Sequence, residues 1–447
     1  MNRGMSMPAI TRGPVNYAGL LVSLSLIVVK PEIVSAQLPA ASPAVLGTGD
    51  NYTALARGFT AISVNPAGLG MSDNPGFSLA LVPIQLRIGV DPLTLDNLTS
   101  AGGLVVSGTT KAYWLDQITE AGELTSRGGL DATPLAFTTG RVGFQISTVG
   151  EGSVELGPDA TELVLFGNAG RTGTARDLRL AGTRMDAWAA TTAALGFGIP
   201  IGGAIDQSFA VGMTLKYTVG HTLVLGRDSG SLIQNNPVEI DLRLPSIAPS
   251  SDEGSSVGSI LRANNGTGVG IDVGGAWQSG KVMVGVAIQN LFNTFEWDLE
   301  GFVYRSGKVL VNDTVTTLDD FDLEQAVALA PASLREEALG QRFGPAFAVG
   351  MAYRATSKIT ITADAQHNTS ETLVVDEASH LGVGLEFRPV QILFLRSGMS
   401  LVSTGRSQYA MGLGLVLGPV NLSAGVLSES GSGDYTVGSV ALSFGHH

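Results

Sequence analysis

Large apolar residues alternate with small or polar residues along the C-terminal half of the chain. Across residues 269–274, for example, valine and isoleucine interleave with glycine and aspartate. Successive side chains of a β-strand point to opposite faces, so each alternating segment predicts one strand. The strands predicted over the whole chain are residues 76–90, 132–149, 152–168, 180–199, 206–226, 267–278, 281–299, 343–354, 358–368, 379–388, 390–402, 407–418, 419–429 and 434–445. The fold class is therefore all-β, with about 14 strands.

The face opposite the apolar one consists mainly of glycine and alanine with isolated charges. Hydrophobic residues make up 44% of the chain and charged residues only 15%, and there are 59 glycines. A soluble β-sandwich also alternates, but its water-facing side carries far more lysine and glutamate. The pattern instead matches a transmembrane antiparallel β-barrel, with lipid outside and a polar lumen inside.

Short and long connections alternate between the predicted strands. Tight turns are expected near residues 279–280, 355–357 and 418–419, whereas residues 91–131 and 301–341 form long connections. Parts of these long loops, residues 94–124 and 319–339, have partly helical patterns. Tight turns on one rim and long extracellular loops on the other are typical of outer-membrane barrels.

The N-terminal residues have the features of a secretory signal peptide. Arg3 and Arg12 precede an apolar run, and the small residues at 34–36 offer a cleavage site after Ala36. An N-terminal membrane anchor is the alternative, although the apolar run is short for a spanning helix. We expect residues 1–36 to be removed on export and the mature chain to reside in the outer membrane.

Composition excludes several classes of protein. The chain contains no cysteine, so disulfide scaffolds and cysteine-ligated metal sites are ruled out. Its net charge of −13 argues against nucleic-acid binding, which needs a basic surface. Nothing in the sequence calls for a cofactor or a metal ion.

Motifs that resemble catalytic signatures lie in unsuitable contexts. Residues 275–281 nearly spell a P-loop, but Val282 follows and the segment joins two strands, which favours a hairpin turn. Residues 254–258 fit G-x-S-x-G within a polar loop rather than between a strand and a helix. His367 and His380 lie near a loop end without an evident serine partner. We therefore predict no catalytic residues and no enzymatic activity.

Isolated charges occupy the small-residue face and are predicted to lie in the lumen. Mixed charges inside a barrel usually pair and fix its shape, and a role in substrate binding is the alternative. The predicted lumen charges are Asp272, Arg354, Asp364, Glu386, Arg388 and Arg396.

A family resemblance appears near the start of the mature chain. The alanine-rich segment 52–69 leads into a short motif, and residues 270–275 and 289–292 also look like strand-end phrases of the same family. This segment resembles the N-terminal part of the FadL family of outer-membrane transporters, whose superfamily includes PorV-like and TraF-like barrels. The motif residues are Asn65, Pro66, Ala67 and Gly68.

The resemblance implies a fold, a function and a set of partners. It implies that the four motif residues belong to a hatch over residues 37–74, followed by a barrel over residues 75–447, although Asn-Pro can also be an ordinary turn. It implies passive uptake of hydrophobic small molecules, of the fatty-acid or aromatic-hydrocarbon type. The alternative is a PorV-like barrel that serves protein secretion or surface attachment with a secretion-system partner. Outer-membrane lipid and lipopolysaccharide would surround either barrel.

The residues Gly157 and Pro158 are a candidate for a lateral opening. They fall inside the predicted strand 152–168, where a proline would remove a backbone donor and interrupt strand pairing. The FadL family is known for a kinked third strand with an opening in the wall, which this placement resembles. The alternative is an ordinary turn at this position.

Overall fold

The computed structural model describes most of the mature chain. The described residues are 38–100, 106–202, 207–251, 256–312, 316–317, 321–369, 373, 378–403, 405–430 and 433–445. The predicted signal peptide, residues 1–36, lies outside them. No helix within these ranges is both long and apolar enough to cross a membrane.

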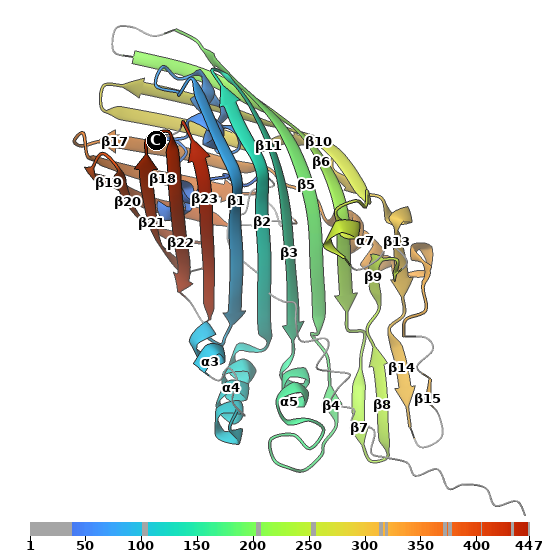
Figure 1. The fold of residues 1–447 in the computed structure, drawn as a ribbon. Coiled ribbons are helices and arrows are strands. Elements are labelled where there is room, and N and C mark those ends of the chain that lie inside the picture. Colours follow the sequence, from blue (N-terminus) through green and yellow to red (C-terminus); the bar gives the residue numbers. More distant parts are fainter. Residues whose placement is uncertain are drawn as a thin grey trace, which may run out of the picture.

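Fourteen antiparallel strands form one closed barrel, which confirms the predicted architecture (Figure 1). Each strand pairs with the next one along the chain, and β1 also pairs with β23, so the wall closes. The strands are β1 (Phe77–Asp91), β2 (Leu124–Thr139), β3 (Val142–Leu156), β5 (Arg184–Pro200), β6 (Gln207–Arg227), β10 (Gly266–Ser279), β11 (Val282–Asn293), β17 (Ala346–Arg354), β18 (Ile359–Asn368), β19 (Ser379–Val390), β20 (Leu393–Val402), β21 (Ser407–Leu417), β22 (Val420–Ser430) and β23 (Asp434–Phe444).

The second and third strands lie earlier in the chain than predicted. Strand β2 begins at Leu124 rather than at residue 132, and β3 ends at Leu156 rather than at residue 168. Residues 158–166, predicted as strand, instead form a helix. The predicted strand 132–149 therefore crosses the turn at Gly140, where φ is 58°, which separates β2 from β3. Residues 125–129 and 150–153 are small or polar, so they lack the alternation with large apolar residues on which the prediction rested.

Large apolar side chains cover the outer face of the wall. Met411 is 70% exposed and Leu381 is 62% exposed, and their neighbours of the same strand phase are similarly open. A water-soluble protein rarely exposes a continuous apolar surface of this kind, whereas lipid favours it. The outer face is therefore the membrane-facing surface.

The long connections gather at one end of the barrel and the tight turns at the other (Figure 1). The long connections carry the helices α3 (Leu95–Ser100), α4 (Gly108–Ala121), α5 (Pro158–Phe166), α6 (Val257–Ile260) and α7 (Ala332–Gly340). A small second sheet is built from β4 (Leu178–Arg179), β7 (Leu232–Asn235), β8 (Val238–Arg243), β14 (Lys308–Val311) and β15 (Thr316–Thr317). Short pairings among β9 (Ser246–Pro249), β13 (Phe302–Arg305) and β16 (Gln325–Ala326) complete this end. We refer to it as the extracellular end.

Residues 38–76, here called the inner segment, lie inside the barrel near the opposite end (Figure 1). They form only short helical turns, α2 (Pro43–Gly47), η1 (Gly58–Ile62) and η2 (Pro66–Gly70), and every residue of these turns is buried. A segment with so little regular structure leaves many backbone groups without partners of their own. It depends on the wall to supply them.

Inward-facing glycines of the wall allow the inner segment to approach closely. A Cβ on Gly212 would lie 2.1 Å from the carbonyl carbon of Pro66, and one on Gly198 would lie 2.1 Å from the amide nitrogen of Gly70. No side chain fits at such distances, so glycine is required there. Comparable close approaches define what we call the glycine belt: Gly143, Gly196, Gly198, Gly212, Gly274, Gly285, Gly350, Gly382, Gly384, Gly398, Gly412 and Gly425.

The glycine belt makes a direct prediction about stability. Replacing Gly212 with valine should push η2 off the wall and lower the free energy of unfolding by about 1–3 kcal/mol, because overpacked sites must shift their neighbours. The midpoint of heat-induced unfolding, followed by the change in gel migration of the barrel, measures this effect. Gly438→Val is the matched control, since a Cβ there points outward and meets nothing within 4 Å. Equal midpoints for the two variants would contradict the close packing.

Candidate functional site

The residues Asn65 to Gly68 form a capped turn that is docked on the wall. The side chain of Asn65 accepts a hydrogen bond from the Ala67 amide at 3.2 Å and so caps the N-terminus of η2. Its Nδ2 atom donates to the carbonyl of Thr53 at 3.1 Å and to that of Gly275 in β10 at 3.2 Å. The motif is thus a turn, as Asn-Pro alone suggests, and one amide side chain also fastens this turn to the barrel.

Polar side chains of the wall satisfy the backbone of the inner segment from several directions. Asp364 accepts from the Thr53 amide at 2.8 Å, and Thr214 donates to the Ile62 carbonyl at 2.7 Å. Gln289 of β11 donates to the carbonyl of Ser63, two residues before Asn65, at 2.8 Å. These bonds and the glycine belt hold the inner segment inside the barrel, at the end opposite the extracellular end.

An ion-pair chain joins the inner segment to the barrel rim. Asp73 contacts Arg57 at 2.6 Å and Arg354, at the end of β17, at 2.9 Å. Burial opposes ionisation of Asp73, but the two guanidinium groups hold the pKa of this carboxyl below its usual value. Arg354 was predicted to be a lumen charge, yet its side chain is 45% exposed at the rim.

The other predicted lumen charges near this rim are engaged in local contacts. Arg396 pairs with Glu386 at 2.7 Å across β19 and β20, and its guanidinium lies 4.9 Å from the ring centre of Phe394. The guanidinium of Arg388 also lies over that ring, 4.7 Å from its centre, and donates to the carbonyl of Gln391. These contacts match the structural interpretation of the charges more closely than a substrate role.

The central part of the lumen contains a buried ion pair whose cation was not predicted. The ammonium group of Lys216 lies 2.6 Å from Asp272, and both side chains are almost fully buried. Asp272 also accepts from the backbone amide of Asn290, which has a positive φ of 50° at a bulge in β11. Lys216 alternates with outward residues of β6 in the same phase as Thr214 and Thr218. This alternation could have placed Lys216 in the lumen from the sequence alone.

A second buried cluster lies further towards the extracellular end. Arg87 contacts Asp131 at 2.6 Å and Glu151 at 2.8 Å, so β1, β2 and β3 each contribute one member. Tyr435 of β23 packs beside them and is also buried. Arg87 was overlooked although it is the one cation in the inward phase of the first predicted strand.

Aromatic side chains fill the lumen above these charges. Trp188 of β5 and residues from the connection 294–343 form a buried apolar cluster, with ring centres about 5–6 Å apart. Such distances are typical of favourable edge-to-face and tilted ring packing. We call this cluster the aromatic cap, and its rings belong to Trp188, Phe295, Trp297, Phe302 and Phe343.

The wall is irregular at two prolines that the sequence analysis did not single out. The pairing of β1 with β2 is interrupted between Leu81–Leu135 and Ile84–Ala132, and the interrupted stretch contains Val82, with a φ of 46°, Pro83 and Pro134. The strand register shifts at this level between β1 and β23 and between β2 and β3. A proline inside a strand removes a ladder donor, so the prolines in the predicted strands were a usable signal.

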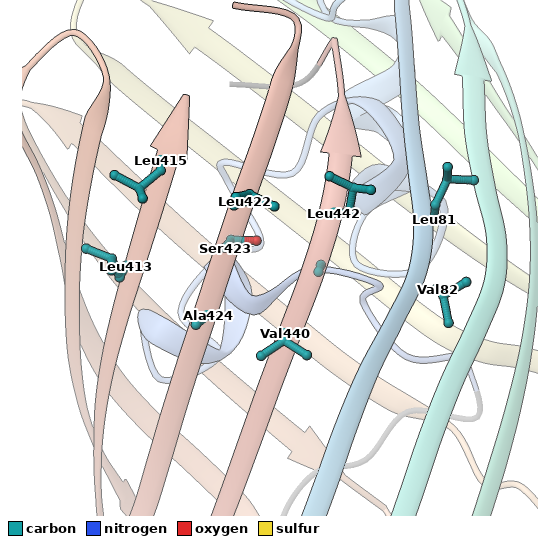
Figure 2. Close-up of a pocket in the computed structure, with 10 residues that line it drawn as sticks. Leu81, Val82, Leu413, Leu415, Leu422, Ser423, Ala424, Val440 and Leu442 are labelled. Atoms are coloured by element: carbon teal, nitrogen blue, oxygen red, sulfur yellow. The ribbon is translucent and has the colours of Figure 1, made fainter. Parts of the chain in front are cut away.

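An apolar groove of about 340 Å³ lies on the lipid side next to this irregularity (Figure 2). Figure 2 shows side chains of β21, β22, β23 and β1 around it. On the inner side, Leu38 and Phe59 of the inner segment pack against the small inward residues Ala80 and Ala136. We call this stretch, residues 81–84 of β1 with residues 132–135 of β2, the proline break.

The residues Gly157 and Pro158 do not interrupt a strand, contrary to the prediction. Gly157 is the N-cap of α5 and Pro158 occupies its first turn, where the missing amide hydrogen costs nothing. Strand β3 pairs with β5 without a register shift from Val142 to Glu155. The third strand is therefore continuous up to the point where this helix begins.

The remaining motifs can also be placed. Residues 275–281 cross the hairpin turn between β10 and β11, where Gly280 has a φ of 54°. The G-x-S-x-G residues 254 and 255 lie outside the described ranges, and Ser256 caps α6. Within the described ranges, no group of three or more His, Asp or Glu side chains is arranged to hold a metal ion.

Comparison with solved structures identifies proteins of the same fold. A FadL homologue from Pseudomonas aeruginosa superposes with a TM-score of 0.50 at 12% identity, covering 92% of this chain and 99% of that one. The toluene transporter TbuX of Ralstonia pickettii gives 0.49 at 12% identity, with 90% and 97% covered. No family model and no curated protein sequence matches the chain. The chain thus has the fold of FadL-like outer-membrane barrels, with a widely diverged sequence.

The central ion pair yields a prediction about stability. Asp272→Ala leaves the buried ammonium of Lys216 without its counter-ion, and such a loss costs about 3–5 kcal/mol of folding free energy. Replacing both residues, as in Lys216→Met with Asp272→Leu, should restore most of that loss, because no buried charge remains. Thermal unfolding in detergent compares the three proteins. A double variant as unstable as Asp272→Ala would show that the cost has another origin.

Proposed function

We propose that this barrel is a passive channel in the outer membrane for hydrophobic small molecules of the fatty-acid or aromatic-hydrocarbon type, which leave sideways through the proline break. Two observations together carry the proposal. The inner segment fills one end of the lumen, and the proline break interrupts strand pairing in the wall beside that segment. The fold and the sequence resemblance to the FadL family support it. The inner segment serves as the hatch that blocks the direct route.

The direct route through the lumen is unfavourable for an apolar molecule. Backbone atoms of the hatch lie directly against the glycine belt, so the hatch occupies space in the lumen next to the wall there. Beyond the hatch is water, and transferring an apolar surface into water costs about 25 cal/mol per Å². Movement of a hydrophobic solute past the hatch into this water is therefore unfavourable.

The sideways route is apolar on both sides of the wall. Leu38 and Phe59 line the interior behind the proline break, and leucine and valine side chains surround the groove outside it. Val82 and Pro134, which both lie in the break, point towards lipid and are exposed. A solute released there passes directly into a solvent that favours it.

The absence of cysteine permits a reversible test of this route. Ile84 and Ala132 are Cα partners at the edge of the break, so cysteines at these two positions could form a disulfide that ties β1 to β2 there. We expect oxidation to reduce uptake of a radiolabelled long-chain fatty acid or of toluene to near the level of vesicles without the protein. Reduction of the disulfide should restore uptake, because nothing else in the chain responds to thiol reagents.

Two controls make the result interpretable. A pair of cysteines at Ile88 and Gly128, which face each other on the same strands away from the break, should leave uptake unchanged on oxidation. Unchanged uptake with the disulfide at positions 84 and 132 formed would refute the lateral route. Absence of uptake by the unmodified barrel, together with co-purification of a secreted protein, would instead favour the secretion or surface-attachment role.

A further inference from the structure

A row of polar side chains lies on the outer wall at the extracellular ends of β18, β19 and β20. His367 of β18 pairs in register with Ser379 of β19, and its Nδ1 atom lies 3.0 Å from the Ser379 hydroxyl. The amide of Ser379 donates to the hydroxyl of Ser403 at 3.0 Å, and the amide of Ser403 donates back to the Ser379 carbonyl at 2.8 Å. All three side chains are exposed on the face that carries the lipid-facing residues.

An apolar hollow of about 500 Å³ lies directly below this row. Its floor is at Ala365, which lies in register between Val349 of β17 and Leu381 of β19. Val349 and Leu381 are 54% and 62% exposed, so their side chains project beyond the small side chain of Ala365 on either side of it. The volume falls within the range of roughly 300–1,000 Å³ that is usual for small-molecule sites.

The polar row offers hydrogen-bond donors whichever tautomer His367 adopts. If Nδ1 carries the proton, it donates to Ser379, and the Ser379 hydroxyl hydrogen is free to point outward. If Nδ1 accepts instead, Nε2 carries the proton and becomes the outward donor. The Ser403 hydroxyl accepts from an amide and so keeps its own hydrogen available. The row therefore suits a group that accepts hydrogen bonds.

We propose that this hollow and its polar row bind one acylated lipid of the outer leaflet. The acyl chain lies along Ala365 between Val349 and Leu381, and ester or phosphate oxygens of the head region accept from Ser379 and Ser403. The orientation follows from the position of the site. Lipid chains run along the wall towards the membrane centre, and lipid head groups lie at its extracellular edge. The polar row of the hollow lies at that edge, and its apolar residues lie two positions nearer the membrane centre on the same strands.

Photo-cross-linking of the detergent-purified full chain tests this assignment. The probe is phosphatidylglycerol with a photoreactive group in one acyl chain, and peptide mass spectrometry locates the adducts. Adducts should concentrate on β17 to β19 in the unmodified protein. Ala365→Leu fills the hollow, and the double change Ser379→Ala with Ser403→Ala removes both serine hydroxyls from the polar row. Each should reduce these adducts by about five-fold or more.

A matched control and two contrary outcomes decide the matter. Ser430→Ala removes an exposed serine from the extracellular edge of β22, outside the residues that line the hollow, and should leave the adducts unchanged. Adducts spread evenly around the barrel, or insensitive to Ala365→Leu, would overturn the proposal. Release of free fatty acid by the unmodified protein but not by Ser379→Ala would also overturn it, because the Ser379–His367 contact would then be a hydrolytic pair. Each variant is first checked for the heat-modifiable gel migration of a closed barrel.

Discussion

The close approach of one backbone to another governs this structure. The internal hydrogen bonds of the inner segment are those of short turns, and the wall completes its packing with glycine and with polar side chains that bond to its backbone. Ten of the fourteen barrel strands carry outward large apolar residues and at least one glycine that the inner segment approaches closely. The composition of the chain follows from these two contacts, because a lumen filled with water would need neither so many glycines nor so few charges.

Polar and apolar regions alternate along the lumen. The hatch fills one end, the ion pairs of Lys216 and Arg87 cross the middle, and the aromatic cap closes the extracellular part. The buried charges are already paired, so they contribute shape and rigidity rather than free binding capacity. An apolar solute finds matching surfaces at the aromatic cap and behind the proline break. Under the proposed function, this arrangement favours release through the wall over release through the end of the lumen that the inner segment fills.

Sequence alternation predicted the barrel best where strands only span the bilayer. From β17 to β23, each strand is about as long as the apolar band requires, and the predicted segments agree with the observed ones within a few residues. The predicted limits of β2 and β3 were wrong, because small and polar residues at 125–129 and 150–153 interrupt the alternation. Lys216 and Arg87 were missed because a single cation among apolar residues carries little periodic signal. Pairing across strands, which a sequence without aligned relatives does not show, was needed to connect Pro83 with Pro134.

The position of the inner segment immediately before β1 has a consequence for assembly. Strand β1 closes the wall against β23, the barrel strand farthest from it in the sequence, so this seam forms only when all fourteen strands are in place. Strands rich in glycine have little intrinsic tendency to remain extended, and they gain stability when something packs against their inner face. The segment that supplies this packing is tethered to the closing strand itself. The barrel thus encloses a segment that directly precedes its own first strand. The wall and the inner segment therefore stabilise each other as the barrel closes.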